Sequence, residues 1–349
     1  GDVDISPDGR IALLGTLRGY ITIVNLNDLS TQAVFFEPNS SIHQLHFLPD
    51  SQHFIAGYTS AEPALIDSQT GETVQTFPLL GSQPLALSPD GTKLAGVKSD
   101  LRTIEIWDVT ANQRITAIEG PIDLVNSLAF SPDGTQLAST NAAAFYAGVT
   151  VWDVATGQQT MFLLEEDTLE TVAFSPDGRY IATGKSLWDA ASGERLNDLS
   201  YELTYSWDRA FVEFSPDSQQ LLIVNGSGQA TLVDIATWEP LFQNIFGSNQ
   251  GNLANFSPDG QTILLGSQLL DAQSGTLAQQ LGGHAVTFEL ASHQFSTVTV
   301  SDLSPDGRLA FTAGAEEDNN GDGFVDPTIK IWEIDSGKII HTLTATDYP

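Results

Sequence analysis

The stretch LAFSPDGTQLAST, residues 128–140, decides the fold because its central phrase recurs along the whole chain. Ser-Pro-Asp-Gly stands at 6–9, 88–91, 131–134, 175–178, 257–260 and 304–307, and degenerate copies stand at 48–51 and 215–218. Successive phrases begin 40 to 47 residues apart. A period of this length is typical of repeated structural units that pack on their neighbours.

The phrase itself predicts a tight β-hairpin. Its Pro suits position i+1 of a type I turn, and its Gly supplies the left-handed residue that follows such a turn. Apolar runs such as LAF precede it, and runs such as RYIATG follow it. A third run ends at pairs such as Trp152-Asp153, and a Thr-Gly or Ser-Gly turn leads into a fourth. Four short strands per repeat, without helical periodicity, predict the blade of a β-propeller.

The chain resembles the WD40 family over essentially its whole length, on phrases such as VWDVATGQ (151–158) and the stretch quoted above. The resemblance implies an all-β fold, a single eight-bladed propeller of four-stranded antiparallel blades. The blades are expected at about 1–38, 39–78, 79–120, 121–165, 166–203, 204–247, 248–294 and 295–349.

The resemblance is incomplete in two respects. The Gly-His that precedes the first strand in the family remains at Gly283-His284 alone. A Trp ends the third strand in four of the eight copies, at Trp107, Trp152, Trp188 and Trp332. We therefore expect the His–Asp–Ser/Thr–Trp hydrogen-bond network of the family to be incomplete here. With four consecutive strands in every blade, we also expect no terminal strand to complete another blade; a strand missing before Gly1 is the alternative.

Composition limits the classes of partner. The 13 Lys and Arg against 44 Asp and Glu give a net charge of −31, which disfavours nucleic acid and anionic membrane surfaces. Cations and basic proteins are the partners that such a surface favours. The absence of Cys excludes disulfides and thiolate chemistry. No apolar stretch reaches the length of a transmembrane helix, so no membrane insertion is expected.

The loop EEDNNGDGFVD, residues 316–326, concentrates oxygen ligands in the last blade and is expected to take about fourteen residues. Residues 318–326 read D-x-N-x-D-G-x-x-D, which is similar to the calcium hairpins of integrin-type propellers. Calcium takes six to eight hard oxygen ligands. The expected ligands are Asp318, Asn320, Asp322, the carbonyl of Phe324, and Asp326 directly or through water. A solvated acidic loop without metal is the alternative reading.

Stacking the repeats reveals a second polar feature. The residue three positions before each turn proline lies on a first strand, and first strands line the channel of a propeller. Blades 3, 4 and 5 carry Ala there. Blades 6, 7, 8, 1 and 2 carry Glu213, Asn255, Asp302, Asp4 and His46, which are consecutive once the ring closes. We expect one polar arc able to hold a cation, waters or a small polar ligand. Ordinary hydrogen bonds to neighbouring strands are the alternative.

Three classes of function remain open from the sequence. A non-enzymatic platform for protein partners is favoured, and the aromatic residues Tyr205, Trp207 and Trp238 are its candidate contacts. Trp238 can equally cover the outer edge of blade 6. A propeller hydrolase or lyase with its site in the channel is the alternative, although no catalytic motif is present. A calcium-stabilised structural component outside the cytoplasm is the third. The acidity and the calcium loop favour an extracytoplasmic or secreted location, with a cytoplasmic one left open.

Overall fold

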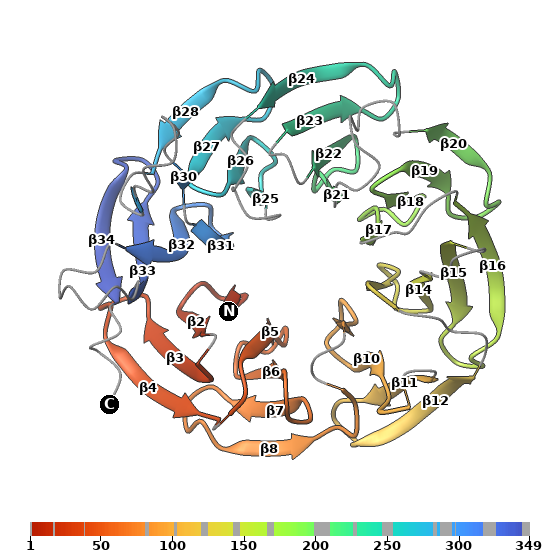
Figure 1. Cartoon of the computed structure of the whole chain (residues 1–349), viewed down its shortest axis with the longest axis horizontal. Coiled ribbons are helices and arrows are strands. Elements are labelled where there is room, and N and C mark those ends of the chain that lie inside the picture. The colour runs from red at the N-terminus through yellow and green to blue at the C-terminus, as the bar shows by residue number, and fades with distance from the viewer. Residues whose placement is uncertain are drawn as a thin grey trace.

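The computed structural model describes residues 2–16, 18–37, 39–80, 84–100, 103–119, 125–141, 147–165, 171–198, 210–225, 229–245, 254–281, 285–286, 295–296, 298–316 and 326–343. These residues form a ring of eight four-stranded antiparallel sheets (Figure 1), which confirms the predicted all-β, eight-bladed propeller. A small extra sheet pairs β29 (Ala285–Val286) with β30 (Phe295–Ser296). Within the described ranges there is no helix able to cross a membrane.

The strands follow one another in chain order within every blade. Blades 1 and 2 contain β1 (Asp2–Ile5), β2 (Ile11–Gly15), β3 (Tyr20–Asn25), β4 (Thr31–Phe36), β5 (Ile42–Phe47), β6 (His53–Tyr58), β7 (Ala64–Asp67) and β8 (Thr73–Thr76). Blades 3 and 4 contain β9 (Leu85–Leu87), β10 (Lys93–Val97), β11 (Thr103–Asp108), β12 (Gln113–Glu119), β13 (Leu128–Phe130), β14 (Gln136–Asn141), β15 (Gly148–Asp153) and β16 (Gln159–Leu164).

The second half of the ring repeats the same order. Blades 5 and 6 contain β17 (Val172–Phe174), β18 (Tyr180–Thr183), β19 (Ser186–Asp189), β20 (Arg195–Asp198), β21 (Ala210–Phe214), β22 (Gln220–Asn225), β23 (Gln229–Asp234) and β24 (Pro240–Ile245). Blades 7 and 8 contain β25 (Ala254–Phe256), β26 (Thr262–Leu265), β27 (Gln268–Asp271), β28 (Leu277–Gln280), β31 (Val298–Leu303), β32 (Leu309–Glu316), β33 (Asp326–Glu333) and β34 (Lys338–Leu343).

The core lies between neighbouring blades. Second and third strands such as β22 and β3 are buried along almost their whole length because a blade covers each of their faces. Fourth strands such as β8 and β20 are mostly exposed because they form the outer rim. Continuous apolar runs in the middle strands therefore indicate burial on both faces rather than a separate core for each blade.

The same hydrogen-bonded turn joins the first strand to the second in each blade. In blade 4, the amide of Gly134 donates to the carbonyl of Ser131 at 2.8 Å, and the Ser131 hydroxyl donates to Asp133 Oδ1 at 2.6 Å. Gly134 has a φ of 66°, the left-handed conformation that the phrase predicts. In the degenerate copies, Ser51 and Ser218 adopt it with φ of 57° and 61°.

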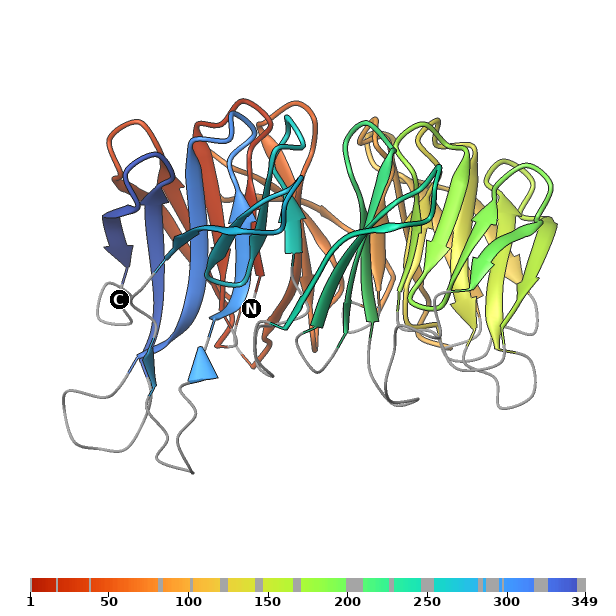
Figure 2. The same ribbon diagram turned by 90° about the horizontal axis from the view of Figure 1, so that it is seen from above.

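These turns contact one another around one face of the ring, which we call the turn face and which lies along the upper edge in Figure 2. The amide of Asp8 donates to Ser51 Oγ at 3.1 Å, from the turn of blade 1 to that of blade 2. A Cβ on Gly91 would lie 2.2 Å from Cδ of Pro49 in the preceding blade. Gly91 is therefore favoured both by its close contact with Pro49 of blade 2 and by its own left-handed backbone conformation.

Side-chain packing closes the ring between its last and first blades. One buried cluster contains Val3 and Leu14 of blade 1 together with Phe311 and Ile331 of blade 8. Every four-stranded sheet consists of consecutive strands, so no described strand completes a distant blade. The expected contiguous closure is confirmed for the described part of the chain.

The tryptophans at the third-strand site form only part of the family network, as predicted. Trp152 Nε1 donates to Ser139 Oγ at 2.9 Å, and Trp332 Nε1 donates to Thr312 Oγ1 at 2.8 Å. Trp188 Nε1 is buried without a hydrogen-bond partner among the described residues. These bonds lie within single blades, so the polar network of the Trp site differs from blade to blade.

We expect Gly91→Ala to destabilise the propeller more than Gly9→Ala does. Both glycines have left-handed φ, of 69° and 70°, so alanine costs each about 1–2 kcal/mol in backbone strain. A Cβ on Gly9 meets no atom within 4 Å, whereas a Cβ on Gly91 collides with Pro49 and adds at least about 1 kcal/mol. Urea unfolding of the two variants measures the difference, and equal losses would show that the turns do not pack across the blade boundary.

Candidate functional site

Five neighbouring innermost strands place a polar side chain at one level of the channel. The strands β21, β25, β31, β1 and β5 contact one another in this order around the ring (Figure 1). The backbone pairs at this level are Glu213 with Leu222, Asn255 with Leu264, Asp302 with Phe311, Asp4 with Leu13 and His46 with Ile55. We call the five first-strand residues the polar arc; all are half-buried.

Three members of the polar arc hydrogen-bond to the main chain of the next blade. Asp4 Oδ2 accepts from the amide of Phe47, and Glu213 Oε1 accepts from the equivalent amide of Phe256 at 3.2 Å. Asn255 Nδ2 donates to a main-chain carbonyl oxygen of β31 at 2.8 Å. These bonds tie adjacent first strands together, so the arc has the structural role that the sequence left open as an alternative.

A second level of cross-blade bonds was not predicted. Asp2 Oδ2 accepts from the amide of Leu45 at 2.8 Å, and Gln44 Oε1 accepts from the amide of Leu85 at 2.8 Å. Both side chains stand two residues before an arc position, so they point from the same face of their strands. Comparing the repeats at this position as well would have revealed them.

The carboxyl groups of the polar arc have raised pKa values. Burial in the channel wall raises the pKa of Asp302 to about 8, and the neighbouring charge of Asp4 acts in the same direction. Burial also raises the pKa of Glu213 to about 8, against the hydrogen bond from Phe256. The pKa of Asp4 is raised by burial despite the opposing charge of His46. The arc therefore has more acidic groups than positive charges to balance them.

One carboxyl oxygen of the arc has no hydrogen-bond partner among the described residues. Glu213 Oε2 is buried without a hydrogen bond among the described residues, and Asp302 is the charge that acts on this side chain. A buried polar atom without a partner costs about 1–3 kcal/mol. The arc thus contains a buried carboxyl oxygen that forms no hydrogen bond with the described residues.

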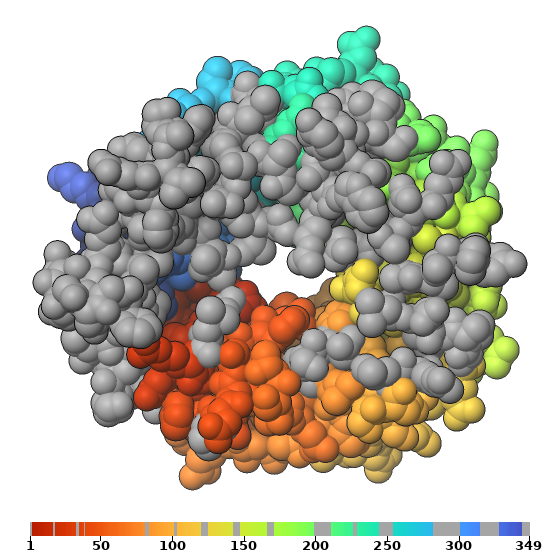
Figure 3. Space-filling model, viewed as in Figure 1, coloured from red at the N-terminus to blue at the C-terminus, as the bar shows by residue number. Residues whose placement is uncertain are grey.

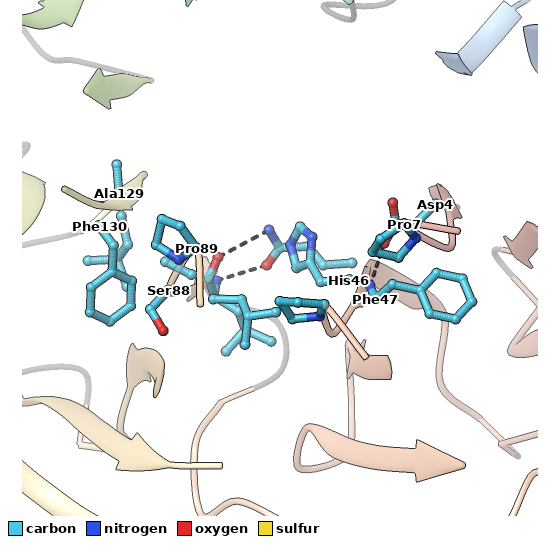
Figure 4. A pocket seen from close by; sticks show the side chains of 14 residues that line it. Asp4, Pro7, His46, Phe47, Ser88, Pro89, Ala129 and Phe130 are labelled. Carbon is cyan, nitrogen blue, oxygen red and sulfur yellow. Dashed lines mark hydrogen bonds between the residues drawn. The ribbon is translucent and has the colours of Figure 1, made fainter. Parts of the chain in front are cut away.

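A hollow opens in the channel beside the arc, on the side of blades 1 to 4. Figure 3 shows the channel as an opening at the centre of the ring. The hollow has a volume of about 720 Å³. Asp4 and His46 lie toward one end of its lining, and Ala129 and Phe130 lie at the other end (Figure 4). The turn prolines Pro7, Pro49 and Pro89 also line it, which places it toward the turn face.

The calcium ligands expected in blade 8 lie mostly outside the described residues, namely Asp318, Asn320, Asp322 and Phe324. Asp326 is described and begins β33, where its backbone pairs with Glu316. The connection between β32 and β33 is therefore nine residues, 317–325, and the expected length of about fourteen is wrong, because the ladder continues past Pro327. Within the described ranges, no three His, Asp or Glu side chains are placed to hold a metal ion.

The aromatic candidates for partner contact differ in what the structure describes. Tyr205 and Trp207 lie outside the described residues. Trp238 occupies the turn between β23 and β24 with a φ of 61°, at the position where blade 7 has Gly275. Its ring is half-buried and packs on the cluster that joins blades 5 and 6, which includes Leu187. Trp238 therefore covers a blade boundary.

Comparison with known proteins agrees with this architecture. The family model "WD domain, G-beta repeat" matches residues 112–153 and 160–190, in blades 3 to 5. WD repeat-containing protein 1 of Gallus gallus is 22% identical over 291 residues, which cover 78% of this chain and 43% of that protein. Protein LST8 homolog of Drosophila melanogaster is 26% identical over 228 residues, 59% of this chain and 70% of that protein. These matches support a WD40-type β-propeller.

A third relative shows the same pattern of partial coverage. The guanine nucleotide-binding protein subunit beta of Zea mays is 26% identical over 194 residues, 51% of this chain and 49% of that protein. The chain spans less than half the length of WD repeat-containing protein 1. The similarity therefore supports a WD40-type propeller fold, and the activities of these relatives do not transfer with it.

We expect Asp302→Asn and Glu213→Gln to stabilise the propeller at high pH relative to the wild type. The folded state keeps both protons up to about pH 8, whereas the unfolded state loses them near pH 4. The stability that these groups contribute is therefore present below pH 4 and is lost as the pH rises to 8. Amides cannot ionise, so each variant should gain at least about 1 kcal/mol on the wild type between pH 5 and 9.

Urea unfolding at both pH values measures this gain, with Asp335→Asn as the control. Asp335 is exposed in the last turn of blade 8, so Asp335→Asn makes the same chemical replacement outside the channel. Among the turn carboxylates, hydrogen bonds from Ser131 and Thr135 lower the pKa of Asp133, and the pKa of Asp90 is lowered to about 2, so these two groups act outside this window. A gain that does not depend on pH would contradict the raised pKa values of the arc.

Proposed function

We propose that this WD40-type propeller is a non-enzymatic platform that binds protein partners, and that a calcium ion orders the loop of blade 8. The observation that supports the platform is the set of cross-blade hydrogen bonds made by Asp4, Glu213 and Asn255. They commit the polar channel residues to holding the blades together. A rigid ring binds with less loss of conformational freedom than a mobile surface.

Charge suggests the chemistry of the partner. The net charge of −31 favours basic proteins and increases their rate of encounter at low ionic strength. Two relatives are named as WD-repeat or LST8 proteins, and a third is by name a subunit of a guanine nucleotide-binding protein. These names are consistent with a role in assembly, and we propose the same role for this chain.

The partner test uses the immobilised propeller and extract from its source cells. A protein captured by the wild type is purified, and its affinity is measured again with Trp207→Ala and with Trp238→Phe. We expect Trp207→Ala to weaken binding about tenfold or more, because Trp is a frequent interface anchor. Trp238→Phe should keep the affinity, since Trp238 packs between blades 5 and 6. A partner with equal affinity for both variants would contradict the proposed contact at Trp207.

The calcium proposal rests on the loop composition and on its flanks. β32 and β33 pair as far as Glu316 and Asp326, so both ends of the loop 317–325 lie at the base of one hairpin. The acidic and amide side chains of the loop supply the hard oxygens that calcium prefers. Binding removes the repulsion among them. Extracellular calcium modules bind with dissociation constants of about 10⁻⁴–10⁻³ M, and we propose an extracytoplasmic location on this basis.

We expect calorimetry on EDTA-treated protein to show saturable binding of about one calcium ion per chain in the affinity range of extracellular modules. Asp322→Ala should abolish this binding, because it removes a central oxygen ligand. Asp335→Ala, which removes an exposed carboxylate from the same blade, should retain it. Equal weak heats for all three proteins would show that the loop is a solvated acidic insertion.

A further inference from the structure

We propose that the ring opens and closes at the boundary between blades 8 and 1 in response to pH, so that this boundary is a conformational switch built into the propeller. We call the boundary the seam; its innermost strands are β31 and β1, which contact each other (Figure 1). The inference is independent of the proposed platform function and of calcium.

The seam is the one boundary that the described chain does not cross. Every other boundary is crossed by the segment that leads from a fourth strand to the next first strand. At the seam, β1 and β31 come from opposite ends of the described chain, and the blades meet through apolar packing that includes Leu14 and Phe311. Blades 8 and 1 can therefore separate without unfolding a linker, and such local openings require less free energy than global unfolding.

The polar bonds that join other first strands are missing at the seam. Asp4 accepts from an amide of blade 2, and Glu213 accepts from the equivalent amide of blade 7. In blade 8, Asp302 Oδ1 accepts instead from the amide of Leu303, its neighbour in sequence, at 2.8 Å. The equivalent amide of blade 1, that of Ile5, donates to Asp4 Oδ1 at 2.9 Å. Between the described residues of β31 and β1 there is no hydrogen bond.

Two acids face each other across the seam instead. Burial, followed by the charges of Asp4 and Asp2, raises the pKa of Asp302 to about 8. Burial also raises the pKa of Asp4, against the charge of His46 in blade 2. Asp302 therefore keeps its proton while the seam is closed and loses it when the seam opens to water.

The other elements around these acids supply no further positive charge. The strands β2, β25 and β26 contain no charged residue. β5 carries His43, which is exposed, besides His46. β32 carries Glu316 at its end, paired with Asp326. Glu213 of blade 6 is itself affected by the charge of Asp302, which raises its pKa after burial. An ionised Asp302 in the closed seam would thus lie among acids, with His46 beyond Asp4.

Proton linkage determines the direction of the switch. In the opened seam, Asp302 is exposed to water and has an ordinary carboxyl pKa of about 4, whereas in the closed seam its pKa is about 8. Between these values opening releases one proton, so the equilibrium constant for opening rises about tenfold per pH unit. The stabilisation of the closed seam is fully present below about pH 4 and is lost as the pH rises to about 8.

The test uses a single introduced cysteine as a reporter, because the chain contains none. Val24→Cys places a thiol in the buried cluster of the seam. Val151→Cys places one in the cluster between blades 4 and 5 and is the matched control, since both valines are 0% exposed. The labelling rate of each folded protein with a methanethiosulfonate reagent is divided by that of a cysteine peptide at the same pH, which corrects for the thiolate fraction. The corrected rate measures how often the site opens.

We expect the corrected rate at Val24→Cys to rise about a hundredfold from about pH 5.5 to 7.5, and that at Val151→Cys to rise less than about tenfold. Adding Asp302→Asn to Val24→Cys should reduce the rise to less than about tenfold, because an amide releases no proton. Asp335→Asn, on the exposed rim, should leave the rise unchanged. Circular dichroism confirms that each variant folds. Asp302→Ala, which supplies the residue that blades 3, 4 and 5 carry at this level, repeats the test if Asp302→Asn does not fold.

Three results would overturn the proposal. An equally small rise at Val24→Cys and Val151→Cys would show that the seam does not respond to pH. An equally large rise at both sites would show that the whole ring opens rather than the seam. A large rise at Val24→Cys that persists in both Asp302 variants would exclude Asp302 as the group that controls the opening.

Discussion

Hydrogen bonds between neighbouring first strands determine how the centre of this propeller is built. First strands lie closest to the ring axis, where the blades converge, so a polar side chain there must find a partner on the next blade. Asp4 and Glu213 each accept a hydrogen bond from the equivalent main-chain amide of the following blade, that of Phe47 and that of Phe256. Blades 3, 4 and 5 use alanine at this level instead and rely on apolar packing.

This division gives the channel two chemically different walls. On one side, carboxyl groups accept hydrogen bonds from backbone amides, and burial raises their pKa values. On the other, small residues leave a hollow. The same residues therefore stabilise the ring and give the channel one polar wall and one apolar wall.

The repeat made most of the fold predictable. Ser-Pro-Asp-Gly specifies its turn through local chemistry, so the turn, the hairpin and the number of blades follow from the sequence. Arc positions were also predictable, because a fixed distance from the turn proline places a residue at a fixed level of the channel. The hydrogen-bond partners of these residues were not predictable, because the bond that the Phe47 amide donates to Asp4 depends on how blades 1 and 2 are staggered.

Other features depend on context that no local pattern contains. The pKa of Asp302 depends on burial and on Asp4 from another blade. Trp238 adopts a left-handed φ that its residue type disfavours, as the turn position requires and Gly275 adopts in blade 7, and its ring packs on the cluster of blades 5 and 6. The loop of blade 8 is shorter than expected because strand pairing continues beyond a proline that normally indicates the end of a strand.

Infrared titration of the carboxyl groups tests the central claim, that burial in the channel wall raises the pKa values of its acidic groups. The difference between the wild type and Asp302→Asn isolates the absorption of one side chain. The structure predicts a protonated carboxyl signal from Asp302 that persists through neutral pH and disappears near pH 8. Loss of that signal near pH 4, as for an ordinary aspartate, would show that the arc is neutralised or solvated and would contradict the account.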